Sequence, residues 1–80
     1  MTNTVMNNII DKKKECNLTQ REMDVLFLMA KGNTNLEIAE ELNVTIHTVK
    51  ANVASILQKF EVRDRIQAVI KAISEKLVDI

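Results

Sequence analysis

The sequence predicts an all-α fold of four helices, and three observations lead to this prediction. The 80 residues include no proline and a single glycine, the two residue types that most disfavour helices. Leu, Ile, Ala, Glu and Lys are abundant, and runs of β-branched residues are few. Apolar residues also recur at helical spacing. Four helices with short connections leave no room for a sheet.

The composition is that of one small globular domain. Hydrophobic residues make up 46% of the chain and charged residues 28%, which is too apolar for a disordered protein. A domain of this size buries only about 60% of the surface of its unfolded chain. We therefore expect marginal stability unless a partner contributes.

The first predicted helix covers about residues 20–31. Thr19 precedes it, and Glu22 three residues later completes the spacing of a capping box. Gly32 follows, and glycine is the residue type that most often ends a helix. Its core-facing positions are Val25, Leu26 and Met29.

The second and third predicted helices are joined by a sharp bend at Asn43. Thr34 and Glu37 repeat the capping-box spacing, and this helix ends near Leu42. Asn43 tolerates the left-handed conformation better than any residue except glycine, so it can end the helix. Small Ala39, four residues before the bend, and apolar Val49, six after it, complete the spacing of a helix-turn-helix. The contacts around the corner come from Ile38, Leu42 and Val44.

The third predicted helix, capped by Thr45, runs to about Phe60, and Asp64 precedes a fourth over about residues 65–76. One face of the third helix is an apolar stripe that we expect to be buried: Val49, Val53, Ile56 and Phe60. The other face is small, polar and nearly free of acid: His47, Thr48, Lys50, Ala51, Ala54, Ser55 and Gln58. Lys59, Arg63 and Arg65 add positive charge at its end, so the formal net charge of zero conceals a local excess. Slim side chains with a lysine near the helix start suit the major groove of DNA, although the same face also fits a plain solvated helix.

The segments "LTQREMDVLFLMAKG", "NTNLEIAEELNVTIHTVKANVASILQKFEV" and "RDRIQAVI" fall in an order that resembles the LuxR/FixJ-type (GerE-like) helix-turn-helix domain of bacterial transcription regulators. The resemblance covers about residues 18–73. Its most specific parts are the Leu-Thr-x-Arg-Glu opening, Glu-Ile-Ala, Thr-Val-Lys and the Arg-x-x-Ala of the last helix. Region 4 of sigma factors shares only the middle of this pattern.

The resemblance implies that the third helix enters the major groove and that the domain dimerises through the fourth helix, about residues 65–76. It implies that Lys50 and Ala51 face the DNA, and that Glu22 and Arg65 are structural. Thr48, Thr34 and Asn35 are implied to lie near phosphates. The full set of predicted DNA-binding residues is Thr34, Asn35, Thr45, His47, Thr48, Lys50, Ala51, Asn52, Ala54, Ser55 and Lys59.

Three positions depart from the family pattern. Asn52 stands where His is usual, Leu36 where Lys is frequent, and Ala54 where a longer polar or basic residue is frequent. Each lost cation removes one possible phosphate contact, and such contacts supply most of the salt-dependent affinity. We therefore expect weaker DNA binding than is usual in the family, or reliance on dimerisation.

Residues 1–17 differ from the rest of the chain and allow two interpretations. Their apolar positions form one helical stripe: Val5, Met6, Ile9 and Ile10. Three lysines follow at 12–14. The segment is either a tail with solvated charges or a short extra helix that docks on Met23 and Phe27, a pair predicted to be exposed, within the chain or across a dimer. The helix-turn-helix domain is then residues 18–76.

Several kinds of function are excluded by what the sequence lacks. Cys16 is the only cysteine and His47 the only histidine, so neither a zinc site nor an intrachain disulfide is predicted. A lone thiol fits the cytoplasm. There is no glycine-rich phosphate loop, no secretion signal and no apolar run of about 18 residues. We expect no enzyme, cofactor, metal, membrane contact or small-molecule substrate.

Two functions remain open. The first is a small regulator that binds specific double-stranded DNA as a homodimer, either on its own or as a domain of a larger protein. The second is a protein-interaction module of the same fold that binds another regulator or RNA polymerase. The neutral charge, Leu36, Ala54 and the Met23 and Phe27 pair favour it.

Overall fold

The computed structural model describes residues 17–79. This part forms α2 (Gln20–Ala30), α3 (Asn35–Leu42), α4 (Ile46–Phe60) and α5 (Arg65–Ser74). The described residues contain no strand, so the predicted all-α fold is confirmed. The interpretations of the N-terminal segment concern residues that lie almost entirely outside this range.

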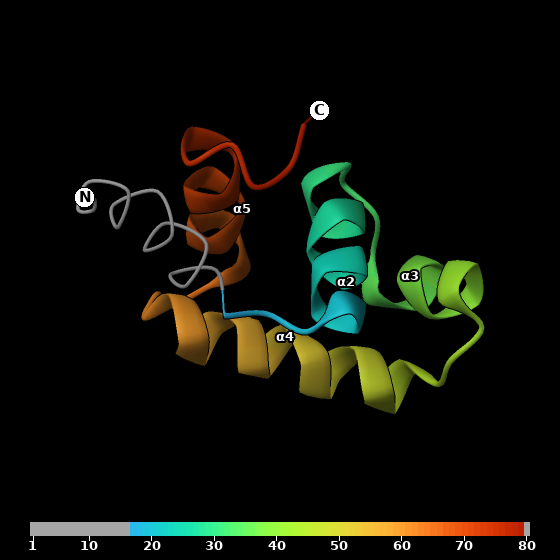
Figure 1. Cartoon of the computed structure of the whole chain (residues 1–80). Helices are drawn as coiled ribbons and strands as arrows, with labels where there is room; N and C mark the ends of the chain where they lie inside the picture. Colours follow the sequence, from blue (N-terminus) through green and yellow to red (C-terminus); the bar gives the residue numbers. More distant parts are fainter. Residues whose placement is uncertain (1–16, 80) are drawn as a thin grey trace, which may run out of the picture.

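The longest described helix, α4, forms the base on which the others pack (Figure 1). α2 and α5 stand on the same side of α4, and α3 lies beside α2 near the start of α4. α4 makes contacts with α2, α3 and α5. One side of α4 therefore packs against the other helices, and its opposite side faces outward.

The predicted helix starts are confirmed by their capping contacts. Thr19 and Thr34 each form a complete capping box, with Glu22 and Glu37 respectively. Thr45 caps α4, and the Asp64 side chain accepts a hydrogen bond from the backbone amide of Gln67 at the start of α5. Each cap satisfies backbone amides that have no partner within the helix.

The bend between α3 and α4 has the predicted geometry. Asn43 has φ 59° and ψ 47°, which is the left-handed conformation, and the amide of Val44 donates to the carbonyl of Ala39 at 3.0 Å. Ala39 is buried where the two helices meet. Glu61 and Lys76 adopt the same left-handed conformation after α4 and α5, which the sequence did not predict. At Lys76 the chain turns back two residues beyond the end of α5, so this helix is shorter than expected.

One hydrophobic core joins the four helices. Its buried members are Val25, Leu26, Met29, Ile38, Ala39, Val49, Ile56, Phe60, Ala68, Ala72 and Val78. Three of the four predicted stripe residues of α4 are among them, and the fourth, Val53, is half-buried and packs against them. The chain after α5 folds back far enough to bury Val78, two residues past the boundary that the sequence suggested.

The predicted exposed pair on α2 needs a correction. Met23 is half-buried and packs against the core, and only Phe27 is exposed, with the Lys31 ammonium 5.2 Å from the centre of its ring. The reason is that α2 contacts three other helices, so its buried arc is wider than a single stripe of apolar residues indicates.

Candidate DNA-binding surface

The outward side of α4 carries a continuous strip of exposed residues. The members recur at i, i+4, i+7 and i+11, and all are exposed: His47, Ala51, Ala54 and Gln58. Lys50 is exposed on one flank of the strip. Since the buried residues of α4 lie on the opposite side, the strip is held rigidly by the core.

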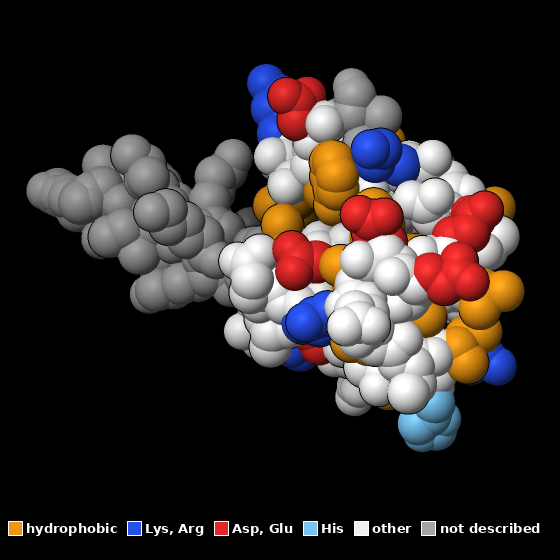
Figure 2. Space-filling model, turned by 90° about the vertical axis from the view of Figure 1, so that its right-hand side faces the viewer, with side chains coloured by type: hydrophobic (Ala, Val, Ile, Leu, Met, Phe, Trp, Pro, Cys, Tyr) orange, Lys and Arg blue, Asp and Glu red, His pale blue; other side chains and the backbone are white. Residues whose placement is uncertain are grey.

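Charge is distributed unevenly between α4 and α3. The segment Ile46–Phe60 contains no acidic residue, whereas Asn35–Leu42 contains three exposed acids and no base: Glu37, Glu40 and Glu41. Acidic side chains accordingly gather on the face seen from the α3 side of the molecule (Figure 2). An anion is therefore favoured along α4 and disfavoured on the outer face of α3.

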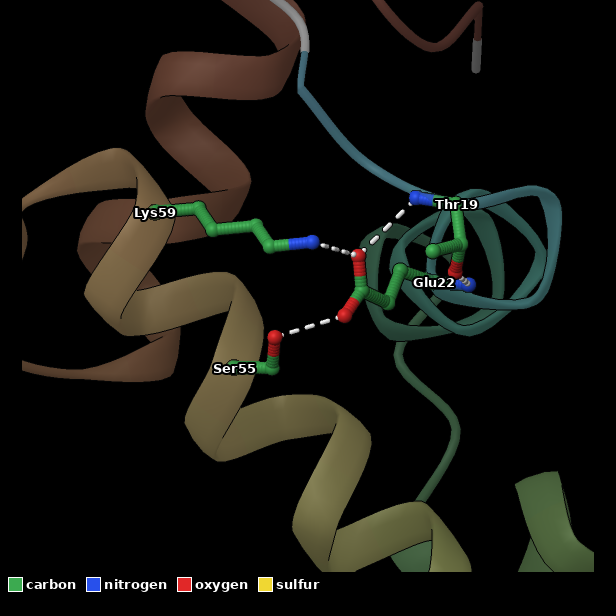
Figure 3. A network of polar contacts seen from close by, with 4 residues as sticks. All are labelled: Thr19, Glu22, Ser55 and Lys59. Carbon is green, nitrogen blue, oxygen red and sulfur yellow. Dashed lines mark hydrogen bonds and ion pairs between the residues drawn. The ribbon is translucent and has the colours of Figure 1, made fainter.

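Two of the predicted DNA-binding residues are engaged by a buried carboxylate on α2. Glu22 is only 5% exposed. Its Oε1 accepts from the Lys59 ammonium at 2.8 Å and from the backbone amide of Thr19 at 2.9 Å, and its Oε2 accepts from the Ser55 hydroxyl at 2.6 Å (Figure 3). Ser55 and Lys59 thus hold α4 against the start of α2.

Burial alone would raise the pKa of Glu22, because the charged carboxylate loses solvent. Hydrogen bonds from Lys59, Ser55 and the Thr19 backbone, together with the positive charge of Lys59, outweigh that cost, so the pKa lies below its ordinary value. Glu22 is consequently ionised at neutral pH and forms an ion pair with Lys59. The structural role expected for Glu22 is therefore borne out.

Other predicted contacts also have structural partners. Thr34 and Thr45 cap helices, and the Thr45 hydroxyl donates to that of Thr48 at 3.0 Å. The Asn35 side-chain oxygen accepts from the Arg65 guanidinium at 2.7 Å, and Arg65 also donates to the backbone carbonyl of Asn33 at 3.2 Å. Arg65 thereby ties the start of α5 to the start of α3, which accounts for its structural role.

The remaining predicted residues fall into two groups. Asn52 is half-buried, and its side-chain nitrogen is enclosed without a hydrogen-bond partner among the described residues. His47, Lys50, Ala51 and Ala54 are exposed. Within residues 17–79, the Lys50 ammonium and the His47 ring form no hydrogen bond or ion pair with another residue, whereas Lys59 is bonded to Glu22. His47, Lys50, Ala51 and Ala54 therefore make up the accessible centre of the surface.

The partners of Glu22 were missed by the sequence analysis, although one pattern pointed to its burial. Glu22 precedes Val25, Leu26 and Met29 by three, four and seven residues, so it lies on the core-facing side of α2. An acid at that position requires a buried partner. The identity of the partner, more than thirty residues later, is visible only in the fold.

The Glu22 network should make the stability of the domain depend on pH. Because the pKa of Glu22 is lowered by folding, its contribution is complete above the pKa of the unfolded chain and is lost as the pH falls through the lower folded value. Glu22→Gln should lower the free energy of unfolding by about 1–2 kcal/mol at pH 7, since Lys59 is partly exposed. Urea denaturation of both proteins from neutral to acid pH should show this difference shrinking. A difference that stays constant with pH would contradict the assignment.

Within residues 17–79, no three His, Cys, Asp or Glu side chains come together in a way that could hold a metal ion. None of the helices in this range is long and apolar enough to cross a membrane.

Comparison with known proteins agrees with the geometry. Residues 16–72 match the family model described as bacterial regulatory proteins, luxR family. Over 75 residues the chain is 49% identical to the response regulator protein VraR of Staphylococcus aureus (strain NCTC 8325 / PS 47), covering 91% of this chain and 36% of that protein. The VraR protein of Staphylococcus epidermidis gives the same values. The chain therefore spans about a third of the length of these relatives. The match to the family model covers most of the chain, so this protein belongs to the luxR family of bacterial regulatory proteins and has its DNA-binding domain.

Proposed function

We propose that this domain binds specific sequences of double-stranded DNA with α4 in the major groove and regulates transcription. The observation that carries the proposal is the exposed strip of α4, which is slim, free of acid and held by a rigid core. A major groove about 12 Å wide admits an α-helix whose outward side chains are small. Ala51 and Ala54 allow close approach of the helix backbone.

Within this surface we assign different tasks to different residues. Lys50 and His47, near the start of α4, reach base edges or phosphates, since the first turns of a recognition helix lie deepest in the groove. Thr48 and the α3 start, with Thr34 and Asn35, lie beside the phosphate backbone. Phosphate contacts set the register of the protein on the duplex, and base contacts set its sequence preference.

We further propose that the domain acts as a homodimer through α5. Three isoleucines at i, i+4 and i+7 face solvent there: Ile66, Ile70 and Ile73, with exposures of 68%, 60% and 47%. An apolar groove alongside is lined by Met29, Gly32, Asn33, Arg65, Ile66, Val69 and Ile70. A row of large apolar residues on the exposed side of a helix is typical of a helix that packs against another copy.

The relatives suggest what kind of larger protein a domain of this type can belong to. VraR is named a response regulator, and this chain corresponds to about a third of its length. We infer that the domain supplies the DNA-binding output of a regulatory protein whose activity is controlled by its amount, by a partner or by a further domain.

A second function is favoured by one observation. Leu36 on α3 is 56% exposed and is followed by the exposed acids of the same helix. An exposed apolar residue beside acids fits a basic protein surface, so another regulator or RNA polymerase is a candidate partner, either in addition to DNA or in its place.

Selection from a random pool of duplexes tests DNA binding. The wild type should enrich a defined sequence, and Lys50→Ala should bind that duplex about 1–3 kcal/mol less tightly, roughly 5- to 150-fold, through loss of a base or phosphate contact. Lys31→Ala is the matched control, because Lys31 follows the end of α2 that points away from α4, and it should bind as the wild type does. Absence of enrichment by the wild type at any salt concentration would favour the protein-interaction function instead.

A further inference from the structure

The side chain of Glu22 connects the core to the candidate DNA surface. Both carboxylate oxygens are used, and two of the three donors, Ser55 and Lys59, come from α4. In Figure 3 the two α4 side chains point toward α2 and converge on the carboxylate. The same two residues are among those that the sequence nominated for DNA contact.

Their direction on α4 differs from that of the exposed strip. At about 100° per residue, the strip from His47 to Gln58 is centred on one line along the helix. Ser55 lies about 70° and Lys59 about 110° from that line, on the flank that faces α2. This placement agrees with the contacts, since α4 and α2 are packed together and Glu22 is almost fully buried.

From this geometry we infer that Glu22 is a positioning residue for DNA binding, and that it withholds Lys59 from the duplex. The inference rests on the proposed function and identifies which lysine of α4 carries the interaction. Lys50 supplies the phosphate or base contact, while Lys59 holds the position and rotation of α4 relative to α2.

The energetic reason lies in the carboxylate. If Lys59 moved to a phosphate, Glu22 would remain ionised and nearly buried with a hydroxyl and one amide as donors, which is unfavourable. The gain from one phosphate contact would have to exceed the cost of leaving a buried carboxylate without its ammonium partner. Lys59 therefore stays with Glu22 when DNA binds.

The salt dependence of DNA binding tests this inference. The affinity falls as salt is added, and each phosphate neutralised by a cation makes the slope of log K against log salt concentration steeper by about 0.9. The probe is the duplex that the wild type selects from the random pool. Lys59→Met keeps the apolar stem of the side chain and should leave the slope unchanged. Lys50→Ala should weaken binding to this duplex, because Lys50 supplies the phosphate or base contact, and Lys31→Ala should change neither the affinity nor the slope.

Glu22→Gln provides a second, independent variant. Glutamine retains an acceptor for the Thr19 amide but carries no charge, so the ion pair that holds Lys59 is lost. Lys59 is then free to reach a phosphate, and the fall of log K with log salt concentration should become steeper by about 0.9. Circular dichroism at the assay temperature checks that each variant is folded. A slope that is shallower by about 0.9 in Lys59→Met, or that is unchanged in folded Glu22→Gln, would overturn the inference. Failure of the wild type to select any duplex would instead overturn the proposed function itself.

Discussion

Val49→Asp is expected to abolish the folded state at 25 °C. The Val49 side chain has no solvent exposure and packs from α4 into the hydrophobic core. An unpaired carboxylate there costs several kcal/mol of desolvation, whether it remains charged or takes up a proton. Small domains have only about 5–15 kcal/mol of stability in total, and an 80-residue chain lies toward the lower end. Far-ultraviolet circular dichroism should show no helical signal, and the amide proton resonances in an NMR spectrum should lie in the narrow range of an unfolded chain.

Ala51→Asp is the matched control for this variant. Ala51 lies two residues later on the same helix but on its exposed strip, so the same substitution should leave the melting transition nearly unchanged. It should nevertheless prevent binding to the selected duplex, because a carboxylate then faces the phosphates. A cooperative melt of Val49→Asp near the wild-type temperature would mean that the packing between α4 and the core is described incorrectly.

The double variant Ile66→Glu/Ile70→Glu is expected to convert the proposed dimer into a folded monomer. Both side chains are largely exposed in the single chain, at 68% and 60%, so glutamate causes no burial cost within one copy. In a two-fold dimer the same residues face their counterparts, where four like charges would repel one another and lose solvent. Sedimentation equilibrium should therefore report the mass of one chain, and affinity for a two-fold DNA site should fall more than affinity for a half-site.

Leu36→Glu gives the appropriate comparison for that double variant. Leu36 has a similar exposure, 56%, but lies on α3 and not on α5. We expect it to leave the mass unchanged. If the α5 double variant sediments as the wild type does, then α5 is not the dimer interface, and the exposed isoleucines require another explanation.

Much of the fold could be predicted because its determinants are local. The capping boxes at Thr19 and Thr34 each involve residues three apart, and the left-handed Asn43 is a property of one residue between two helices. The apolar stripe of α4 repeats within a single helix. Interactions of this kind are complete within about one turn, so a pattern in the sequence is sufficient to recognise them.

The candidate DNA surface could be predicted only in part. The exposure of His47, Lys50, Ala51 and Ala54 follows from their position opposite the apolar stripe, and the structure agrees with it. Ser55 lies close to the same face in the sequence pattern, yet its hydroxyl is directed at Glu22. The helical pattern indicates which residues avoid the core, but it does not distinguish an exposed side from a flank that touches a neighbouring helix.

The sequence by itself determined the number and order of the helices of residues 17–79, their N-terminal caps, the bend at Asn43 and the family to which the chain belongs. Only the tertiary structure decided that Lys59 and Ser55 bond to Glu22, that Arg65 bonds to Asn35, and that Met23 packs inward. The bonded residues are thirty or more positions apart in the sequence, and the burial of Met23 depends on how many helices surround it. Their geometry is set by the rotation and crossing of packed helices, which side-chain shape across the whole core determines and no local pattern encodes.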